Sequence, residues 1–185
     1  MRQLVALTGR AGSGKTFCSR LFEDQGYIRI KFADSLKDML RAILRNCGVP
    51  QNQIERYIEG DLKELPTHYL MGRSPRFAMQ TLGNEWGRKT MDPDFWVSLT
   101  YHRIKAALEA GKKVVVDDCR YDNEAMIIEN LGGYVVKIDG RRPTVTKPDH
   151  ESERGVSNYL ITDTLNNTGD VSLTKSEVMR ISNGN

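Results

Sequence analysis

Cysteine and histidine are scarce, and their spacing argues against two kinds of site. The three cysteines are odd in number and form no C-x-x-C pair, which predicts reduced thiols and a cytoplasmic protein rather than a disulfide framework. The three histidines stand far apart with no cysteine near them. A zinc site is therefore not expected, because zinc takes several histidine or cysteine ligands at characteristic spacings.

Long apolar runs and an excess of one charge are also lacking. No stretch approaches the roughly 18 apolar residues of a membrane span. The first residues lead directly into an expected strand rather than a signal peptide, so no membrane partner is expected. The net charge is only +3 over 185 residues. That excess is too small to predict nucleic-acid binding, but it is compatible with a small phosphorylated ligand.

The remaining composition is that of a folded globular protein. Hydrophobic residues make up 39% and charged residues 28% of the chain, and 185 residues favour a single domain over residues 1–185. Strand-like and helix-like segments alternate along it. Strands are expected over residues 3–7, 27–32, 114–116, 134–138 and 158–162, and helices over 17–22, 36–44, 76–90, 97–108, 123–131 and 171–181. This order predicts a three-layer α/β fold, with a central parallel sheet of about five strands flanked by helices.

The strongest chemical signal is a complete G-x-x-x-x-G-K-[ST] motif between the first expected strand and the first helix. Backbone N–H groups of such a loop turn inward around phosphate oxygens. The lysine would contact the β- and γ-phosphates of ATP, and the threonine hydroxyl would ligate Mg²⁺. The alternative is a glycine-rich turn that caps a helix. The predicted ATP-binding residues are Gly9, Arg10, Ala11, Gly12, Ser13, Gly14, Lys15 and Thr16.

A second signal follows the β-branched run at 114–116, where Asp117, Asp118 and Arg120 occur together. A carboxylate at the end of a buried strand beside a phosphate-binding loop can hold Mg²⁺ or orient an attacking group, and arginine binds phosphate with two hydrogen bonds. Acidic residues after strands also cap helices, so a purely structural role is the alternative. Thr16, Asp117 and Asp118 are the candidate Mg²⁺ ligands.

The loop motif alone does not distinguish a kinase from other nucleoside triphosphatases. A chain of 185 residues leaves no room for the second motor domain of a helicase, and no N-K-x-D-like guanine-reading segment is present where it is needed. A small kinase also requires an acceptor-binding region and a lid. Residues 34–90, a helical insertion, and 139–156, a charged loop, are the candidates. A permanently ordered surface loop is the alternative to a lid.

Several further motifs occur in an order that resembles one family, the deoxynucleoside monophosphate kinases of tailed bacteriophages. The segment at 32–37 matches its F-A-x-x-L/I-K pattern. An R-x-x-x-Q-x-x-G segment begins at residue 76 and leads through Arg88 to D-x-W-V at 94–97. D-x-R at 118–120, a Gly-Gly pair at 132–133 and H-x-S-E-x-G at 150–155 follow. The resemblance runs from about Leu4 to the last helix, and residues 162–170 match it poorly.

The resemblance implies transfer of the ATP γ-phosphoryl group to a deoxynucleoside 5′-monophosphate, with Mg²⁺ as cofactor. The implied catalytic residues are Lys15, Asp118, Arg120, Arg141 and Arg142. The implied acceptor-binding residues are Asp34, Lys37, Arg76, Gln80, Arg88, Arg120 and Glu124.

Alternatives remain for several of these assignments. Lys37, Arg76, Arg88, Arg141 and Arg142 could be solvated surface charges, and Gln80 could serve helix packing. A kinase of another small acceptor, such as dephospho-coenzyme A or a sugar acid, and a nucleotide-binding ATPase without transfer activity also remain open. The expected partners are small-molecule nucleotides, and a homodimer is possible.

Overall fold

The computed structural model describes residues 1–140 and 155–184, and the chain divides into two compact units. The first unit contains Met1–Phe32 and Thr100–Asn185, and the second contains Ala33–Leu99. Each unit has its own hydrophobic core.

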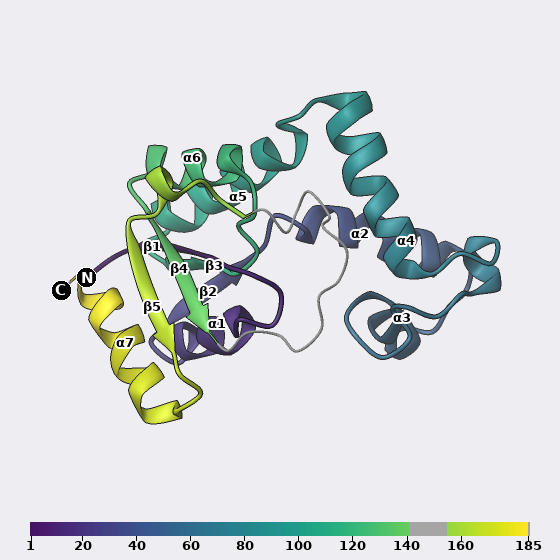
Figure 1. Cartoon of the computed structure of the whole chain (residues 1–185). Helices are drawn as coiled ribbons and strands as arrows, with labels where there is room; N and C mark the ends of the chain where they lie inside the picture. Colours follow the sequence, from purple (N-terminus) through teal and green to yellow (C-terminus); the bar gives the residue numbers. More distant parts are fainter. Residues whose placement is uncertain (141–154, 185) are drawn as a thin grey trace. The chain divides into compact units, whose positions relative to one another are not determined.

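The first unit is built on a five-stranded parallel sheet (Figure 1). Its spatial order is β2-β3-β1-β4-β5, and each neighbouring pair is parallel. All five residues of the central strand β1 are buried, because strands flank it on both sides and helices cover both faces. The strands are β1 (Leu4–Thr8), β2 (Tyr27–Ile30), β3 (Lys113–Val116), β4 (Tyr134–Gly140) and β5 (Asp163–Asn167).

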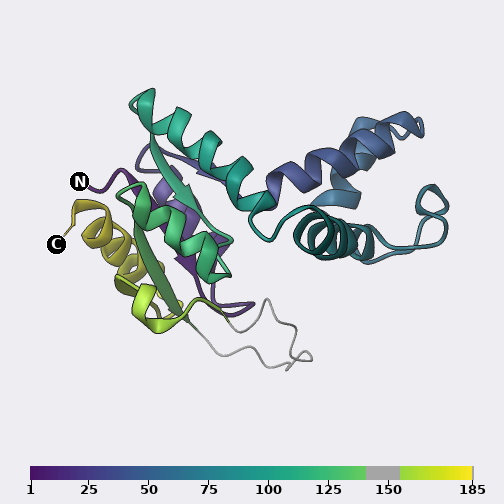
Figure 2. The ribbon, with the colours of Figure 1, turned by 90° about the horizontal axis from the view of Figure 1, so that it is seen from above.

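Helices cover both faces of this sheet and complete three layers. Helices α1 (Lys15–Glu23) and α7 (Val171–Asn183) lie on one face, while α6 (Asp122–Asn130) and the C-terminal part of α5 (Phe95–Glu109) lie on the other (Figure 1). The N-terminal residues and the end of α7 lie side by side in both ribbon views (Figure 1 and Figure 2), and Arg2 N donates to Ser182 O at 2.8 Å. The predicted α/β class and the sheet of about five strands are confirmed.

The second unit is entirely helical. It contains α2 (Asp34–Asn46), α3 (Gln51–Ile58), a 3₁₀ turn η1 (His68–Leu70), α4 (Pro75–Gln80) and the π-helix η2 (Thr81–Met91). Its core is formed by Leu40, Leu44, Val49, Ile54, Tyr57, Ile58 and Met79, which come from α2, α3, α4 and the connection after α2. The sequence predicted helices in this region, but not a separate α3.

The predicted helix over residues 76–90 is found with a change of helical type at Thr81. The indole N–H of Trp96 donates to Gly83 O at 2.9 Å, and the ring lies so close to Gly87 that a Cβ there would overlap it. The two glycines therefore admit a buried tryptophan against the backbone of the π-helix, a helical form that is rare at this length.

The predicted last strand is wrong in position. Residues 158–160 form a 3₁₀ turn, and the strand is the polar segment that follows, Asp163–Asn167. Thr162 N donates to Val135 O at 2.8 Å, which leads the chain into the sheet beside β4. Because β5 is an edge strand, only its central Leu165 is buried, so it carries little of the apolar signal by which buried strands are detected.

Candidate active site

The glycine-rich motif forms the turn between β1 and α1. Gly9, Gly12 and Gly14 have φ angles of 141°, 79° and 95°, a region that favours glycine. A Cβ at Gly9 would lie 2.8 Å from Ile138 O, and one at Gly14 would overlap the Asn167 amide. The turn therefore follows the ends of β4 and β5 closely. It leads into α1, whose first backbone N–H groups have no helical partners.

Lys15 folds back over this turn. Its ammonium donates to Gly9 O at 2.6 Å and to Arg10 O at 2.8 Å. These neutral carbonyl groups are weaker partners for an ammonium ion than phosphate oxygens are. A phosphate bound in the turn would therefore draw the Lys15 ammonium away from the two carbonyl oxygens. The lysine of this motif makes such a contact with the β- and γ-phosphates.

Asn167, the last residue of β5, stabilises the glycine-rich turn through a side-chain hydrogen bond. The sequence did not predict this role. The side-chain amide of Asn167 donates to Ser13 O at 3.0 Å, and its carbonyl oxygen accepts from Thr174 Oγ1 on α7 at 3.2 Å. Ser13 is buried, and its hydroxyl has no hydrogen-bond partner in the described part of the chain. No local pattern identifies Asn167, because its partner lies 154 residues away.

Asp117 lies at the end of β3, where the sequence predicted a carboxylate. Its Oδ2 lies 3.2 Å from Ser19 Oγ on α1 and forms ion pairs with Arg29 Nη1 at 3.6 Å and Lys31 Nζ at 3.9 Å. Its Oδ1 is buried without a hydrogen-bond partner among the described residues. The cations and Ser19 fix one oxygen, and the other stays available for a ligand.

These features fit a magnesium ion. Magnesium prefers hard oxygen ligands and is bound by one or two carboxylates, with water and substrate phosphates completing its shell. Ser19 Oγ also lies 3.0 Å from Thr16 O, so a single hydroxyl connects the two segments that carry the predicted ligands Thr16 and Asp117.

Asp118 and the segment after it have well-defined contacts. Asp118 Oδ1 accepts from Phe32 N at 2.9 Å, which ties β3 to the chain leaving β2. Glu124 is buried, and its Oε2 accepts from Arg120 N at 2.7 Å and Tyr121 N at 3.2 Å. Glu124 therefore fixes the backbone that presents the exposed Arg120. The predicted roles of Asp118 in catalysis and Mg²⁺ binding, of Arg120 in catalysis and acceptor binding, and of Glu124 in acceptor binding stay predictions.

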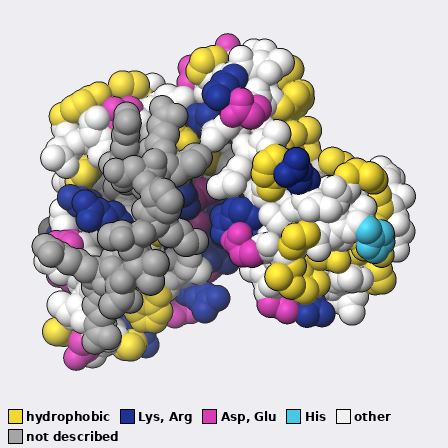
Figure 3. All heavy atoms as spheres, turned by 45° about the vertical axis from the view of Figure 1, so that its right-hand side comes forward, with side chains coloured by type: hydrophobic (Ala, Val, Ile, Leu, Met, Phe, Trp, Pro, Cys, Tyr) yellow, Lys and Arg dark blue, Asp and Glu magenta, His cyan; other side chains and the backbone are white. Residues whose placement is uncertain are grey.

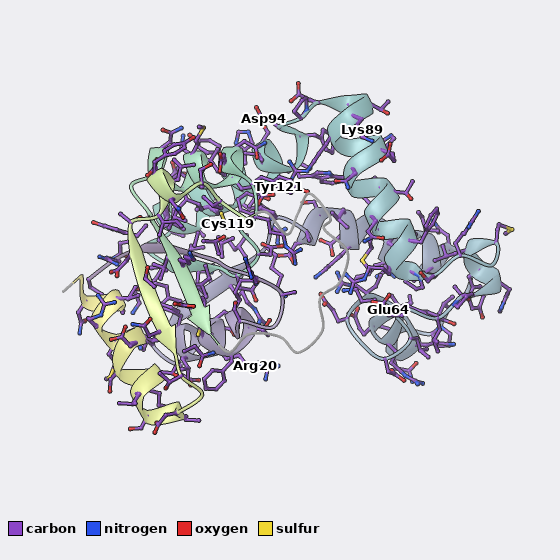
Figure 4. All side chains as sticks on the ribbon, viewed as in Figure 1. Arg20, Glu64, Lys89, Asp94, Cys119 and Tyr121 are labelled. Carbon is purple, nitrogen blue, oxygen red and sulfur yellow. The ribbon has the colours of Figure 1, made fainter. Side chains whose placement is uncertain are left out.

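Cys119 lies between Asp118 and Arg120 and is labelled in Figure 4, as is Tyr121. It is buried, and desolvation raises the pKa of its thiol well above the usual value, with Glu124, Asp118 and Asp122 adding to the effect. A thiol in this environment stays protonated. It is therefore a packing residue and not a nucleophile.

Five predicted acceptor residues belong to the second unit. Lys37 on α2 is buried, with Nζ 2.6 Å from Glu59 Oε1, so its interpretation as a solvated lysine is wrong. Arg76 Nε on α4 lies 2.9 Å from Glu64 Oε1, and Arg88 Nη1 donates to Pro93 O at 3.3 Å. Asp34 is the first residue of α2, and Gln80 is exposed at the end of α4.

The predicted catalytic residues Arg141 and Arg142 lie outside the described residues. Of the predicted lid over residues 139–156, residues 141–154 also lie outside the described residues. In the described part of the chain, no helix is long and apolar enough to cross a bilayer.

Comparison with known proteins identifies the family of this chain. A family model for deoxynucleotide monophosphate kinase matches residues 70–178. A protein of Acanthamoeba polyphaga mimivirus, whose name places it among the deoxynucleotide monophosphate kinases, is 33% identical over 172 residues. That alignment covers 85% of this chain and 86% of the relative. The chain belongs to the deoxynucleotide monophosphate kinase family. The predicted family is thereby confirmed, and a phage origin stays an expectation.

Solved structures also align with this chain at low sequence identity. A gluconokinase from Sinorhizobium meliloti 1021 aligns with a TM-score of 0.46 and 15% identity, covering 100% of this chain and 97% of that one. A dephospho-CoA kinase from Campylobacter jejuni aligns with a TM-score of 0.44 and 15% identity, covering 99% and 96%. Similarity at this level does not bear on the substrate.

Proposed function

We propose that this family member transfers the γ-phosphoryl group of ATP to a deoxynucleoside 5′-monophosphate and releases ADP and a deoxynucleoside diphosphate. The observation that carries the proposal is the complete phosphate-binding turn, with Lys15 folded over it and Asp117 at the end of the adjacent strand. Family membership supports the choice of a nucleotide acceptor.

The donor is bound by the first unit. Backbone N–H groups of the turn at residues 9–16 and the N-terminus of α1 hold the phosphates, and Lys15 leaves the carbonyl oxygens of Gly9 and Arg10 to contact the β- and γ-phosphate oxygens. Thr16 and Asp117 would hold Mg²⁺, and the ion would neutralise charge on the transferring phosphate. Arg29, Lys31 and Ser19 keep Asp117 oriented through its other oxygen.

The transfer itself needs little covalent help from the protein. An oxygen of the acceptor phosphate forms a bond to the γ-phosphorus, and the bond from that phosphorus to the β–γ bridging oxygen breaks. ADP leaves with the electron pair. The two substrates are both anionic, so cations must offset their repulsion. Lys37, Arg76 and Arg120 are the proposed partners of the acceptor phosphate, Gln80 is the proposed partner of the base, and Asp118 orients the acceptor.

An acceptor panel tests the proposal. ADP formation is followed in the presence of ATP and Mg²⁺ with each deoxynucleoside monophosphate, each ribonucleoside monophosphate, dephospho-coenzyme A and a sugar acid. We expect ADP formation to depend on one or more deoxynucleoside monophosphates. Formation of ADP at the same rate without any acceptor, or only with a non-nucleotide acceptor, would contradict the proposal.

A further inference from the structure

A cluster of five charged side chains surrounds the connection between α3 and α4 in the second unit, and one of its cations forms no ion pair with residues 1–140 or 155–184. Four of the five form two ion pairs. Lys37 Nζ lies 2.6 Å from Glu59 Oε1, and Arg76 Nε lies 2.9 Å from Glu64 Oε1. The fifth member is Lys63, which precedes Glu64, a residue labelled in Figure 4. In the space-filling view, basic, acidic and apolar side chains intermingle on the surface of this unit (Figure 3).

The backbone of Lys63 is fixed at both ends. Lys63 N donates to Gly60 O at 3.3 Å, and Lys63 O accepts from Arg76 N at 2.9 Å. The first bond ties the residue to the turn after α3, and the second ties it to the first turn of α4. Lys63 is therefore held beside Arg76 by the main chain, whatever its side chain does.

The Lys63 ammonium carries a positive charge that the cluster does not balance. Within residues 1–140 and 155–184 it forms no hydrogen bond or ion pair. The charged groups that face it are the cations Arg76 and Lys37 and the carboxylates Glu59 and Glu64. Each of these carboxylates already forms a close ion pair with one of the other cations, so the cluster holds three cations against two anions.

This surplus costs free energy in the protein without a ligand. Desolvation, and then repulsion from Arg76 and Lys37, lowers the pKa of Lys63 to about 8, although Glu59 and Glu64 act in the opposite direction. A partly buried cation next to two others is destabilising unless an anion offsets it. Groups perturbed in this way are typical of binding and catalytic sites.

We propose that Lys63 binds the phosphate group of the nucleoside monophosphate acceptor together with Lys37 and Arg76. The inference rests on the proposed function for the identity of the anion, a phosphomonoester dianion that carries about two negative charges above pH 7. Glu59 and Glu64 hold Lys37 and Arg76 in place before the acceptor arrives. The dianion then supplies the negative charge that the cluster lacks, and Lys63 is the cation that it newly pairs.

Paired binding measurements test the role of Lys63. The dissociation constants of an accepted deoxynucleoside monophosphate and of the same deoxynucleoside without phosphate are measured calorimetrically for the full chain. Lys63→Met is expected to weaken monophosphate binding about 10- to 100-fold, the range for losing one hydrogen bond between charged groups. Nucleoside binding should not change. Lys63→Arg should bind the monophosphate nearly as well as the wild type. Lys89→Met is the matched control, because that exposed lysine pairs with Glu85 in the same unit.

The pH dependence of the affinity for the monophosphate is a second test. A purely structural role for Lys63 would not produce it. Above a pKa of about 8 the unliganded lysine loses its charge, so wild-type affinity for the monophosphate should fall towards tenfold per pH unit between pH 8 and 9.5. The ratio to nucleoside affinity removes any titration of the base. Lys63→Arg should show no such fall, because arginine stays charged throughout this range. If Lys63→Met fails to fold, the pH profiles of the wild type and Lys63→Arg still test the role of Lys63.

Different experimental results would contradict the role of Lys63 and the proposed function. If the wild type phosphorylates deoxynucleoside monophosphates and Lys63→Met binds them as tightly as the wild type, the role of Lys63 is wrong and the proposed function stands. Equal losses for monophosphate and nucleoside would also overturn it. If the wild type binds no monophosphate, both proposals fail.

Discussion

The Ser19 hydroxyl lies 3.2 Å from Asp117 Oδ2 and 3.0 Å from Thr16 O, so one buried side chain on α1 connects the glycine-rich turn to the end of β3. A serine has a single proton to donate, which these two oxygens must share. Arg29 Nη1 donates to the same hydroxyl at 3.4 Å. Ser19 is thus a positioning residue for both proposed magnesium ligands.

Replacement of Ser19 by alanine should affect both stability and magnesium use. It leaves buried acceptors without their donor, which costs about 1–3 kcal/mol of unfolding free energy. The Mg²⁺ concentration for half-maximal activity should rise, because Asp117 loses one of the groups that fix its orientation. Urea unfolding and magnesium titration measure the two effects. Ser176→Ala removes an exposed hydroxyl on α7 and should leave both unchanged.

Gly87→Ala tests the packing of the π-helix. A Cβ there overlaps the Trp96 ring, so we expect the free energy of unfolding to fall by about 1–3 kcal/mol, as for other overpacked sites. Gly83→Ala is the control, because its Cβ would meet only Leu36 at an ordinary 3.6 Å. Both tryptophans of the chain, Trp86 and Trp96, lie in the second unit, so their fluorescence follows its unfolding by urea. Equal effects of the two substitutions would contradict this packing.

Arg120→Ala should impair the use of the acceptor more than that of the donor. Loss of one charge-stabilising donor is expected to raise KM for the monophosphate or lower kcat by about 10²-fold. The affinity for ATP should change far less. Steady-state kinetics with each substrate varied in turn separate the two effects, and Arg103→Ala on α5 is a surface control. A comparable loss of ATP affinity would show that Arg120 serves the donor instead.

The turn between β1 and α1 and the carboxylate after β3 form where the sequence predicts them, because their determinants are local. The motif at residues 9–16 contains the glycines, the lysine and the helix start within eight consecutive residues, and the β-branched run before Asp117 identifies a buried strand. The polar edge strand β5 carries no comparable signal, so the sequence places it five residues early.

Residues whose roles depend on distant contacts were not predictable in this way. Asn167 acts through Ser13, 154 positions away. Lys63 stands out only when Lys37, Arg76 and their two glutamates are assembled around it. The burial of Lys37 likewise depends on a contact 22 positions away, with Glu59, which the alternative of a solvated surface charge did not anticipate.

The most direct test follows the γ-phosphoryl group of ATP in the wild type and in Lys15→Ala. With ATP labelled at the γ-phosphorus and a deoxynucleoside monophosphate present, the label should appear in the deoxynucleoside diphosphate. Lys15→Ala should slow this by about 10²-fold or more while keeping the wild-type circular dichroism spectrum, because the Lys15 ammonium donates to carbonyl groups of the turn and the residue is not a member of the core cluster. Label released only as inorganic phosphate, or wild-type transfer by Lys15→Ala, would contradict a phosphoryl-transfer site at this turn.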